Sequence, residues 1–379
     1  MQINKSFDKS DMTASTLRRA SATCWRSALT AAMLLAGASG IGLAQWPGSE
    51  PYLPSPVRTV STVPANGDVN PYGVAFVPKN FETGAGPLKH GDILVSNFNN
   101  SLNLQGTGTT IVRVPASGTP TLFFQGKTGL GLTTALGTLQ YGFVVVGNGP
   151  TPTGSSSSAE PGSLLVIDNQ GKLIQTIANA WIQYPWDMAL IDHGDRATAY
   201  VTNALNGTVS RLDFAVSSSG LTLLKAKTIA SGYVHRGDPA ALFVAPTGLV
   251  YDAVPGRLYV ASTGDNAVFA IPDAADTEDK GKGFVVYQDN VHLHGALGLA
   301  EAPNGHLLVT NNDTINSDPS RPSEIVEFTK GGNFVKEISV DPAQGGSFGL
   351  AVSSTNKQSI LAAVDDNAAT LIIWTLNEP

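Results

Sequence analysis

The chain alternates between short apolar segments and turns rich in Gly, Pro and Asn, and one pair of apolar segments recurs along it. The second segment of each pair is strongly apolar and ends in Asn, Thr or Asp. These second segments are Ile93–Asn97, Phe143–Asn148, Ala199–Asn203, Leu258–Thr263, Leu307–Asn311 and Leu361–Asp365. Their mean spacing of about 54 residues is near the period of β-propeller blades, because four short strands and their turns account for that length.

The other apolar segments complete a four-strand unit around each second segment. A first strand, in most units containing Gly, precedes it, and third and fourth strands follow it. The first strands are predicted to begin at Tyr72, Gly131, Trp186, Thr247, Leu297 and Phe348. The pattern therefore predicts an all-β fold, a six-bladed β-propeller with four-stranded blades.

The last blade lacks a fourth strand of its own after its third strand, Leu371–Trp374. The segment Val57–Val63, which precedes the first blade, alternates between apolar and polar residues as a half-buried strand does. We expect this N-terminal strand to complete the last blade and to close the ring, which protects sheet edges that would otherwise be exposed.

The first 44 residues have the pattern of a signal peptide. Basic residues precede the apolar stretch Ala28–Leu43, and the small residues Gly42 and Ala44 stand at the −3 and −1 positions before Gln45. We expect 1–44 to be removed, 45–56 to be a linker and 57–379 to form the propeller, without stable membrane insertion, in the periplasm or secreted. The only cysteine, Cys24, leaves with the leader, so the mature chain forms no disulfide.

Composition and charge narrow the class of partner. The 40 Gly, 23 Pro and 14% charged residues favour strands joined by tight turns over packed helices. A net charge of −7 argues against the concentrated basic surface that non-specific binding to nucleic acid requires. We therefore expect a monomer that binds a small molecule or an envelope protein, and no nucleic acid.

The motif Pro-x-Gly-[Leu/Val]-Ala, followed by Leu-x-Val-x-Asn, resembles the NHL-repeat propellers and their relatives over roughly residues 57–376. Those relatives include the gluconolactonase-like (SMP-30) enzymes, the paraoxonase-type lactonases and the virginiamycin B lyase group. The gluconolactonase-like enzymes typically supply a Glu from an early first strand, which this chain lacks. At the ends of the second strands only Asp365, with its neighbour Asp366, is acidic, so the ligand set implied by the resemblance is incomplete.

The long insertions place the candidate site on one face of the propeller. Segments 98–109, 149–162, 231–246 and 312–323 all fall on the side where second strands end and first strands begin, which we call the loop-rich face. Functional groups concentrate on loops held by a rigid frame. His235 and His294 lie in or beside these loops. In one interpretation they are metal ligands or general bases at the channel mouth, and in the other they are loop residues bonded to backbone carbonyls.

Asp187 replaces the Gly that stands at this position of other first strands (Gly73, Gly248, Gly298, Gly349). A carboxylate there lies near the axis, flanked by aromatic residues, and burial raises its pKa toward the catalytic range. The alternative is a carboxylate that only accepts bonds from neighbouring backbone N–H groups. The aromatic residues at the starts of first strands are the candidate ligand contacts: Tyr72, Tyr184, Trp186 and Phe348.

The polar residues that end the second strands form a predicted ring around the axis: Asn97, Asn148, Asn203, Asn311 and Asp365. Oxygen atoms that converge there are the ligands that calcium prefers, and zinc is the alternative metal because it also takes His ligands. The alternative is structural, because Asn and Asp at strand ends commonly bond the following turn.

Three functions follow from these observations. The first is a binding propeller that holds a small polar ligand or an envelope protein at the loop-rich face. The second is a metal-dependent lactonase, hydrolase or lyase at the mouth of the central channel, with Asp187, His235 and His294 as catalytic residues. The third is a structural scaffold.

Overall fold

The computed structural model describes residues 51–53, 58–355 and 358–377. The predicted leader, 1–44, lies outside the described residues, as does most of the predicted linker. Within the described ranges, no helix has both the length and the apolar character that a membrane span requires.

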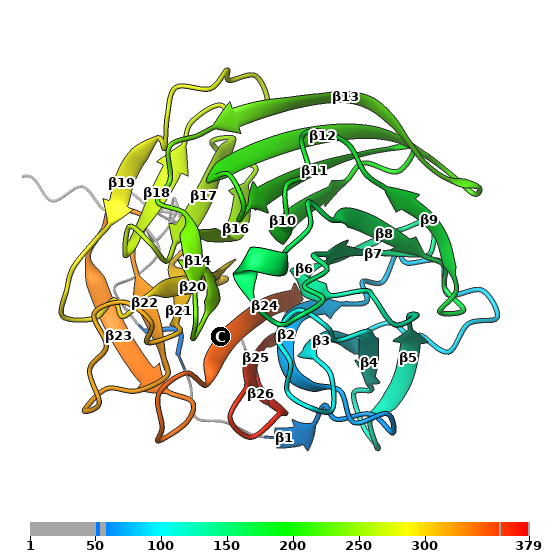
Figure 1. Ribbon diagram of the computed structural model, residues 1–379, viewed down its shortest axis with the longest axis horizontal. Coiled ribbons are helices and arrows are strands. Elements are labelled where there is room, and N and C mark those ends of the chain that lie inside the picture. The colour runs from blue at the N-terminus through cyan, green and yellow to red at the C-terminus, as the bar shows by residue number, and fades with distance from the viewer. Residues whose placement is uncertain (1–50, 54–57, 356–357, 378–379) are drawn as a thin grey trace, which may run out of the picture. The chain divides into compact units, whose positions relative to one another are not determined.

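Six four-stranded antiparallel sheets follow one another along the chain (Figure 1), so the predicted six-bladed propeller is confirmed. The first three sheets are β2 (Val69–Phe76), β3 (Ile93–Asn99), β4 (Thr110–Val114) and β5 (Thr121–Gln125); β6 (Leu132–Leu139), β7 (Phe143–Asn148), β8 (Ser163–Ile167) and β9 (Leu173–Ile177); and β10 (Pro185–Asp192), β11 (Arg196–Asn203), β12 (Thr208–Ser217) and β13 (Gly220–Ala230).

The fourth and fifth sheets are β16 (Pro246–Asp252), β17 (Arg257–Ser262), β18 (Ala267–Ile271) and β19 (Phe284–Tyr287); and β20 (Ala296–Glu301), β21 (Leu307–Asn311), β22 (Glu324–Phe328) and β23 (Phe334–Ser339). The sixth is β24 (Ser347–Thr355), β25 (Gln358–Asp365), β26 (Thr370–Asn377) and β1 (Arg58–Ser61). Strand β1 pairs antiparallel with β26, with Arg58 opposite Ile373 and Ser61 opposite Thr370.

The innermost strand of each sheet packs against the innermost strand of the next, and β24 packs against β2, so the six sheets close a ring. All six innermost strands run in the same direction. They begin on the loop-rich face, and they end on the opposite face, which we call the turn face. The connections 100–109, 149–162, 231–245 and 312–323 lie on the loop-rich face.

The apolar core lies between neighbouring sheets. Each of the six interfaces has its own cluster of buried aliphatic and aromatic side chains, supplied by both of the sheets that meet there. The second strands carry the strongest apolar runs because their side chains are buried on both faces, as in β7, where all six residues are buried. A seventh cluster, described below, lies at the loop-rich end of the axis.

A hydroxyl group joins neighbouring sheets at three of these interfaces. It belongs to the residue before the terminal Asn of the second strand, accepts a hydrogen bond from the innermost strand of its own sheet and donates one to the next sheet. The bonds run from Gly73 N to Ser96 Oγ to Thr133 O, from Asp187 N to Thr202 Oγ1 to Thr247 O, and from Gly298 N to Thr310 Oγ1 to Phe348 O. These bonds fix the spacing of the innermost strands around the axis.

We expect Thr310→Val to lower the free energy of unfolding by about 2 kcal/mol, because it leaves a buried N–H on Gly298 and a partly buried carbonyl on Phe348 without these partners. Urea denaturation of the variant measures the loss. Thr310→Ser keeps the hydroxyl and is the matched control. A Val variant no less stable than the Ser variant would show that the bridge contributes nothing.

Candidate binding site in the central channel

An aromatic seal closes the central channel at the loop-rich face. Tyr72 stacks on Phe98 at a centroid distance of 4.4 Å and on Phe348 at 4.6 Å, and Tyr184 meets the edge of Phe243 at 4.8 Å. Trp186 lies between these groups. All of these rings are buried except that of Phe348, which is partly buried. We call these six residues the aromatic seal.

The predicted ligand contacts Tyr72, Tyr184, Trp186 and Phe348 are therefore brought together, but they face one another. Two further rings fill the space among them. Phe98 comes from the end of β3, and Phe243 comes from a hairpin inserted between the third and fourth sheets, β14 (Arg236–Asp238) and β15 (Leu242–Val244).

Tyr184 has a left-handed backbone, with φ of +64°, which is rare for a bulky side chain. Three contacts hold it there. Its N–H donates to Pro161 O, its carbonyl accepts from Ala204 N at 3.0 Å, and its hydroxyl bonds Thr151 Oγ1 at 2.8 Å. Such strain persists only where the surroundings over-determine the conformation, so the seal is a fixed part of the fold.

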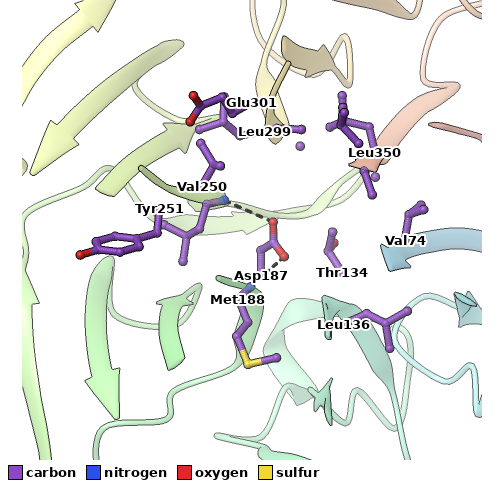
Figure 2. A pocket seen from close by; sticks show the side chains of 16 residues that line it. Val74, Thr134, Leu136, Asp187, Met188, Val250, Tyr251, Leu299, Glu301 and Leu350 are labelled. Atoms are coloured by element: carbon purple, nitrogen blue, oxygen red, sulfur yellow. Dashed lines mark hydrogen bonds between the residues drawn. The ribbon is translucent and has the colours of Figure 1, made fainter. Parts of the chain in front are cut away.

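Beyond the seal, the channel holds a cavity of about 290 Å³. Its lining comes from all six innermost strands, and it reaches the partly exposed Tyr251, Glu301 and Val352 near the strand ends on the turn face. Figure 2 shows the apolar side chains Val74, Leu136, Leu299 and Leu350 around it. The cavity is thus entered from the turn face, opposite to the face that carries the long loops.

Asp187 is the charged group inside this cavity, and Figure 2 shows its carboxylate between the third and fourth sheets. Met188 N donates to Oδ1 at 2.7 Å, and Leu249 N donates to Oδ2 at 3.3 Å. No cationic side chain of the described ranges bonds it. Burial raises the pKa of Asp187 to about 7, and the two backbone hydrogen bonds offset this effect only in part.

Four of the other sheets carry Gly at the corresponding position (Gly73, Gly248, Gly298 and Gly349), and the space around these glycines explains why a side chain there is unusual. A Cβ at Gly349 would lie 1.7 Å from Tyr72 O, and one at Gly248 would lie 2.4 Å from Leu297 O. Those glycines allow neighbouring innermost strands to touch. At Asp187 the chain accommodates a carboxylate instead, which bonds the next strand through Leu249 N.

A second acidic group lies at the mouth of the cavity. Lys330 Nζ bonds Glu301 Oε1 at 2.6 Å and Asp252 Oδ2 at 2.5 Å, so one ammonium group lies between two carboxylates. Burial raises the pKa of Glu301, although the bond from Lys330 works in the opposite direction. The sequence pattern did not single out Glu301. The sequence feature that could have identified it is an acidic residue at the end of a first strand, where the side chain reaches the channel.

The two predicted catalytic histidines lie apart from Asp187. His235 is exposed on the hairpin side of the loop-rich face, and its Nδ1 lies 3.0 Å from Tyr233 O. His294 is buried before β20, where its Nδ1 bonds Asn316 O. Neither residue lines the cavity.

The predicted ring of Asn and Asp residues makes bonds within its own sheets. Asn148, Asn203 and Asn311 each accept a backbone N–H from the segment that leads into their own first strand: Gly131, Gln183 and His294. Asn97 donates to Thr62 O and Thr110 Oγ1, and Asp365 Oδ1 accepts from Ala368 N. Among the described residues, no group of three or more His, Cys, Asp or Glu is spaced to hold a metal ion.

Comparison with known proteins supports the fold. No family model matches the chain, and no curated protein matches it in sequence. Several solved structures match the chain in fold. A luciferin-regenerating enzyme matches with 12% identity over 85% of this chain and 95% of its own, at a TM-score of 0.51. A GH93 α-L-arabinofuranosidase of Fusarium graminearum, solved with arabinobiose, matches with 10% identity over 85% and 98%, at 0.51.

A gluconolactonase from Xanthomonas campestris matches with 10% identity over 86% of this chain and 99% of its own, at a TM-score of 0.50. The chain therefore has the fold of the gluconolactonase-like six-bladed propellers, as its repeat motif predicts. At these identities the likeness extends to the fold alone.

Proposed function

We propose that this protein binds a small organic cation in the central channel, entered from the turn face. The observation that carries the proposal is the Asp187 carboxylate, which has no cationic partner among the described residues and lies in a cavity whose walls combine apolar side chains with polar groups. A buried carboxylate is stabilised most by a positive charge at hydrogen-bonding distance. An ammonium group on a compact apolar body supplies both the charge and the surface that these walls can contact.

The charges at the mouth favour the same ligand class. Glu301 and Asp252 outnumber Lys330, and Asp187 lies further in. A cavity lined by one sign of charge raises the local concentration of the opposite ion. In this proposal the predicted leader places the binding outside the cytoplasm, in the periplasm or the medium.

Isothermal titration of the purified protein with butylammonium and with butanol tests the proposal. The cation is expected to bind and the neutral alcohol to bind far more weakly. Binding of the cation is expected to tighten about tenfold between pH 6 and pH 8, because the fraction of ionised Asp187 rises about tenfold over that range. Asp187→Asn is expected to abolish both the binding and its pH dependence.

Two results would contradict this function. One is binding of butanol as tight as that of butylammonium, which would assign the cavity to neutral ligands. The other is unchanged cation binding by Asp187→Asn. The matched control is Glu301→Gln at the mouth, which is expected to weaken binding by less than Asp187→Asn because the Glu301 carboxylate already has a Lys partner.

A second candidate function uses the same carboxylate. A pKa near 7 suits a general acid or base, so Asp187 also has the ionisation behaviour of a catalytic group. A hydrolase or lyase at this site would act without the predicted histidines, since neither lines the cavity. Release of a product from a bound cation during the titration, followed by mass spectrometry, separates catalysis from binding alone.

A further inference from the structure

The fifth sheet departs from the repeat at one buried position. Where the third strand begins, opposite the terminal polar residue of the second strand, four sheets carry a hydroxyl residue: Thr110, Ser163, Thr208 and Thr370. The fourth sheet carries Ala267 there. The fifth carries Glu324, whose Oε2 accepts from Asn311 Nδ2 at 3.1 Å. A carboxylate thus replaces a small neutral side chain inside the sheet.

A second departure faces the first. His294 stands where Gly131 and Gln183 stand in the second and third sheets, since all three donate their N–H to the terminal Asn. Its Nε2 lies 3.9 Å from Glu324 Oε1, and both side chains are 2% exposed. Its Nδ1 donates to the carbonyl of Asn316, which can only accept, so Nε2 of the neutral imidazole is an acceptor.

The result is a buried group in which one acceptor atom on each of three side chains lacks a donor. Within the described part of the chain, neither His294 Nε2 nor Glu324 Oε1 has a hydrogen-bond partner, and Asp313 Oδ1 nearby has none either. An unpaired buried acceptor is costly, and two that face each other repel. By contrast, the other buried His–Glu pair of this sheet is fully bonded: His306 Nδ1 lies 2.6 Å from Glu327 Oε1, and Glu327 also accepts from Tyr52 N and Leu53 N.

The loop 312–323 closes over this group and is strained. Asp313, Asn316 and Ser323 have φ values of +58°, +55° and +53°, in the left-handed region. The loop is held by the Asp313 carboxylate, which accepts from Ser323 N and Gly345 N, and by the bond from His294 to Asn316. Strained backbone of this kind gathers at switches and binding sites because its surroundings must hold it in place.

We propose that His294 and Glu324 form a proton-uptake site that controls the loop 312–323. One proton shared between Nε2 and Oε1 converts two facing acceptors into a hydrogen-bonded pair, and His294 then holds Asn316 in place. Without that proton, Glu324 and Asp313 are two buried carboxylates beside an acceptor nitrogen, and opening of the loop lets water reach all three.

Burial raises the pKa of Glu324 to about 7, and Asp313 adds to this effect while His294 opposes it. Burial also raises the pKa of Asp313. Because the folded-state pKa of Glu324 lies above its usual value of 4.5, the closed loop is favoured at low pH and loses stability as pH rises toward 7. Six other charged groups of the surrounding turns have their own partners: Asp289, His292, Asp318, Arg321, Asp341 and Asp365. Asp366, whose N–H donates to Gly346 O, also has its pKa raised to about 7 by burial, and it acts in the same direction as Glu324.

Hydrogen exchange of the full chain, followed by mass spectrometry of peptides from 312–323, tests the proposal. After correction for the intrinsic rate, protection in the wild type is expected to fall about tenfold between pH 6 and pH 8. Glu324→Gln, whose amide donates to His294 Nε2 at every pH, is expected to keep the high protection at both pH values. His294→Gln, whose amide can donate to Glu324 Oε1 without an added proton, is expected to lose the pH dependence.

Glu327→Gln is the matched control, since it changes the bonded pair of the same sheet and is expected to leave the pH dependence of the loop unchanged. Equal protection of the wild-type loop at pH 6 and pH 8 would overturn the proposal, as would a Glu324→Gln variant that follows the wild type. Recovery of protection at pH 8 on addition of calcium or zinc would also overturn it, because the cluster would then be a metal site.

Discussion

Asp187 is expected to make the free energy of unfolding depend on pH by up to about 4 kcal/mol between pH 4 and pH 8. Its pKa in the folded chain is about 7, against 3.8 for the free side chain. The folded state therefore holds a proton that the unfolded state has lost between these values, and stability falls as pH rises through this window. Each unit of difference corresponds to about 1.4 kcal/mol.

The variant Asp187→Asn isolates this contribution, because other acids with raised pKa, such as Glu324 and Asp366, act in the same direction. Asn keeps an oxygen for Met188 N but places an amide beside Leu249 N, at a cost of about 1 kcal/mol. We therefore expect the variant to be less stable than the wild type at pH 4 and more stable, by about 2–3 kcal/mol, at pH 8. Urea denaturation at several pH values measures the crossing.

Asp289→Asn is the control, because the pKa of Asp289 is shifted in the opposite direction to that of Asp187. Burial acts to raise the pKa of Asp289, but bonds from Tyr287, His292 and Val291 outweigh it and lower the pKa to about 2. This carboxylate therefore stabilises the fold above pH 4, and its replacement is expected to destabilise the protein at pH 8. If Asp187→Asn instead changed stability by the same amount at pH 4 and at pH 8, Asp187 would have no raised pKa.

The fold was predictable from the sequence because one unit is repeated six times. The apolar second strands, such as Phe143–Asn148, are buried on both faces and therefore leave continuous apolar runs. The Gly of the first strands marks contact between neighbouring strands at the axis, as the 1.7 Å approach of a Cβ at Gly349 to Tyr72 O shows. Each of these sequence features is weak evidence when it occurs once, but its repetition in successive blades makes the prediction of the fold reliable.

The site was only partly predictable. Asp187 stood out because it breaks the Gly pattern, and the structure places its carboxylate inside the channel cavity. The sequence could not reveal which end of the channel is open, because the rings that complete the seal come from outside the first strands. Phe98 ends a second strand and Phe243 arrives on an inserted hairpin, so neither falls in the repeat of Tyr72 and Phe348.

The departures from the repeat are the positions that carry chemistry. Asp187 replaces a Gly and lines the cavity, and Glu324 replaces a hydroxyl residue and is buried. Among the described residues, neither carboxylate bonds a Lys or Arg side chain. At the regular positions the side chains bond other parts of the propeller. Asn203, for example, makes three side-chain hydrogen bonds. Comparing each blade with the others therefore separates residues that hold the propeller together from residues available for binding.

Trp186→Ala is expected to lower the free energy of unfolding by about 4 kcal/mol, because it leaves a cavity among Tyr72, Phe98, Tyr184 and Phe243 that these rings cannot fill. The loss comes from packing, since the indole Nε1 has no hydrogen-bond partner in the part of the chain that the structure describes. Urea denaturation at one pH measures it.

Trp181→Ala is the matched control, because that side chain is 41% exposed five residues earlier in the chain, and its loss is expected to be under about 1 kcal/mol. Trp186→Phe is expected to recover a large part of the stability, since a ring still occupies the centre of the seal. Similar losses for Trp181→Ala and Trp186→Ala would mean that the rings at the axis rearrange freely. The channel would then not be closed at the loop-rich face, and a ligand could reach Asp187 from both sides.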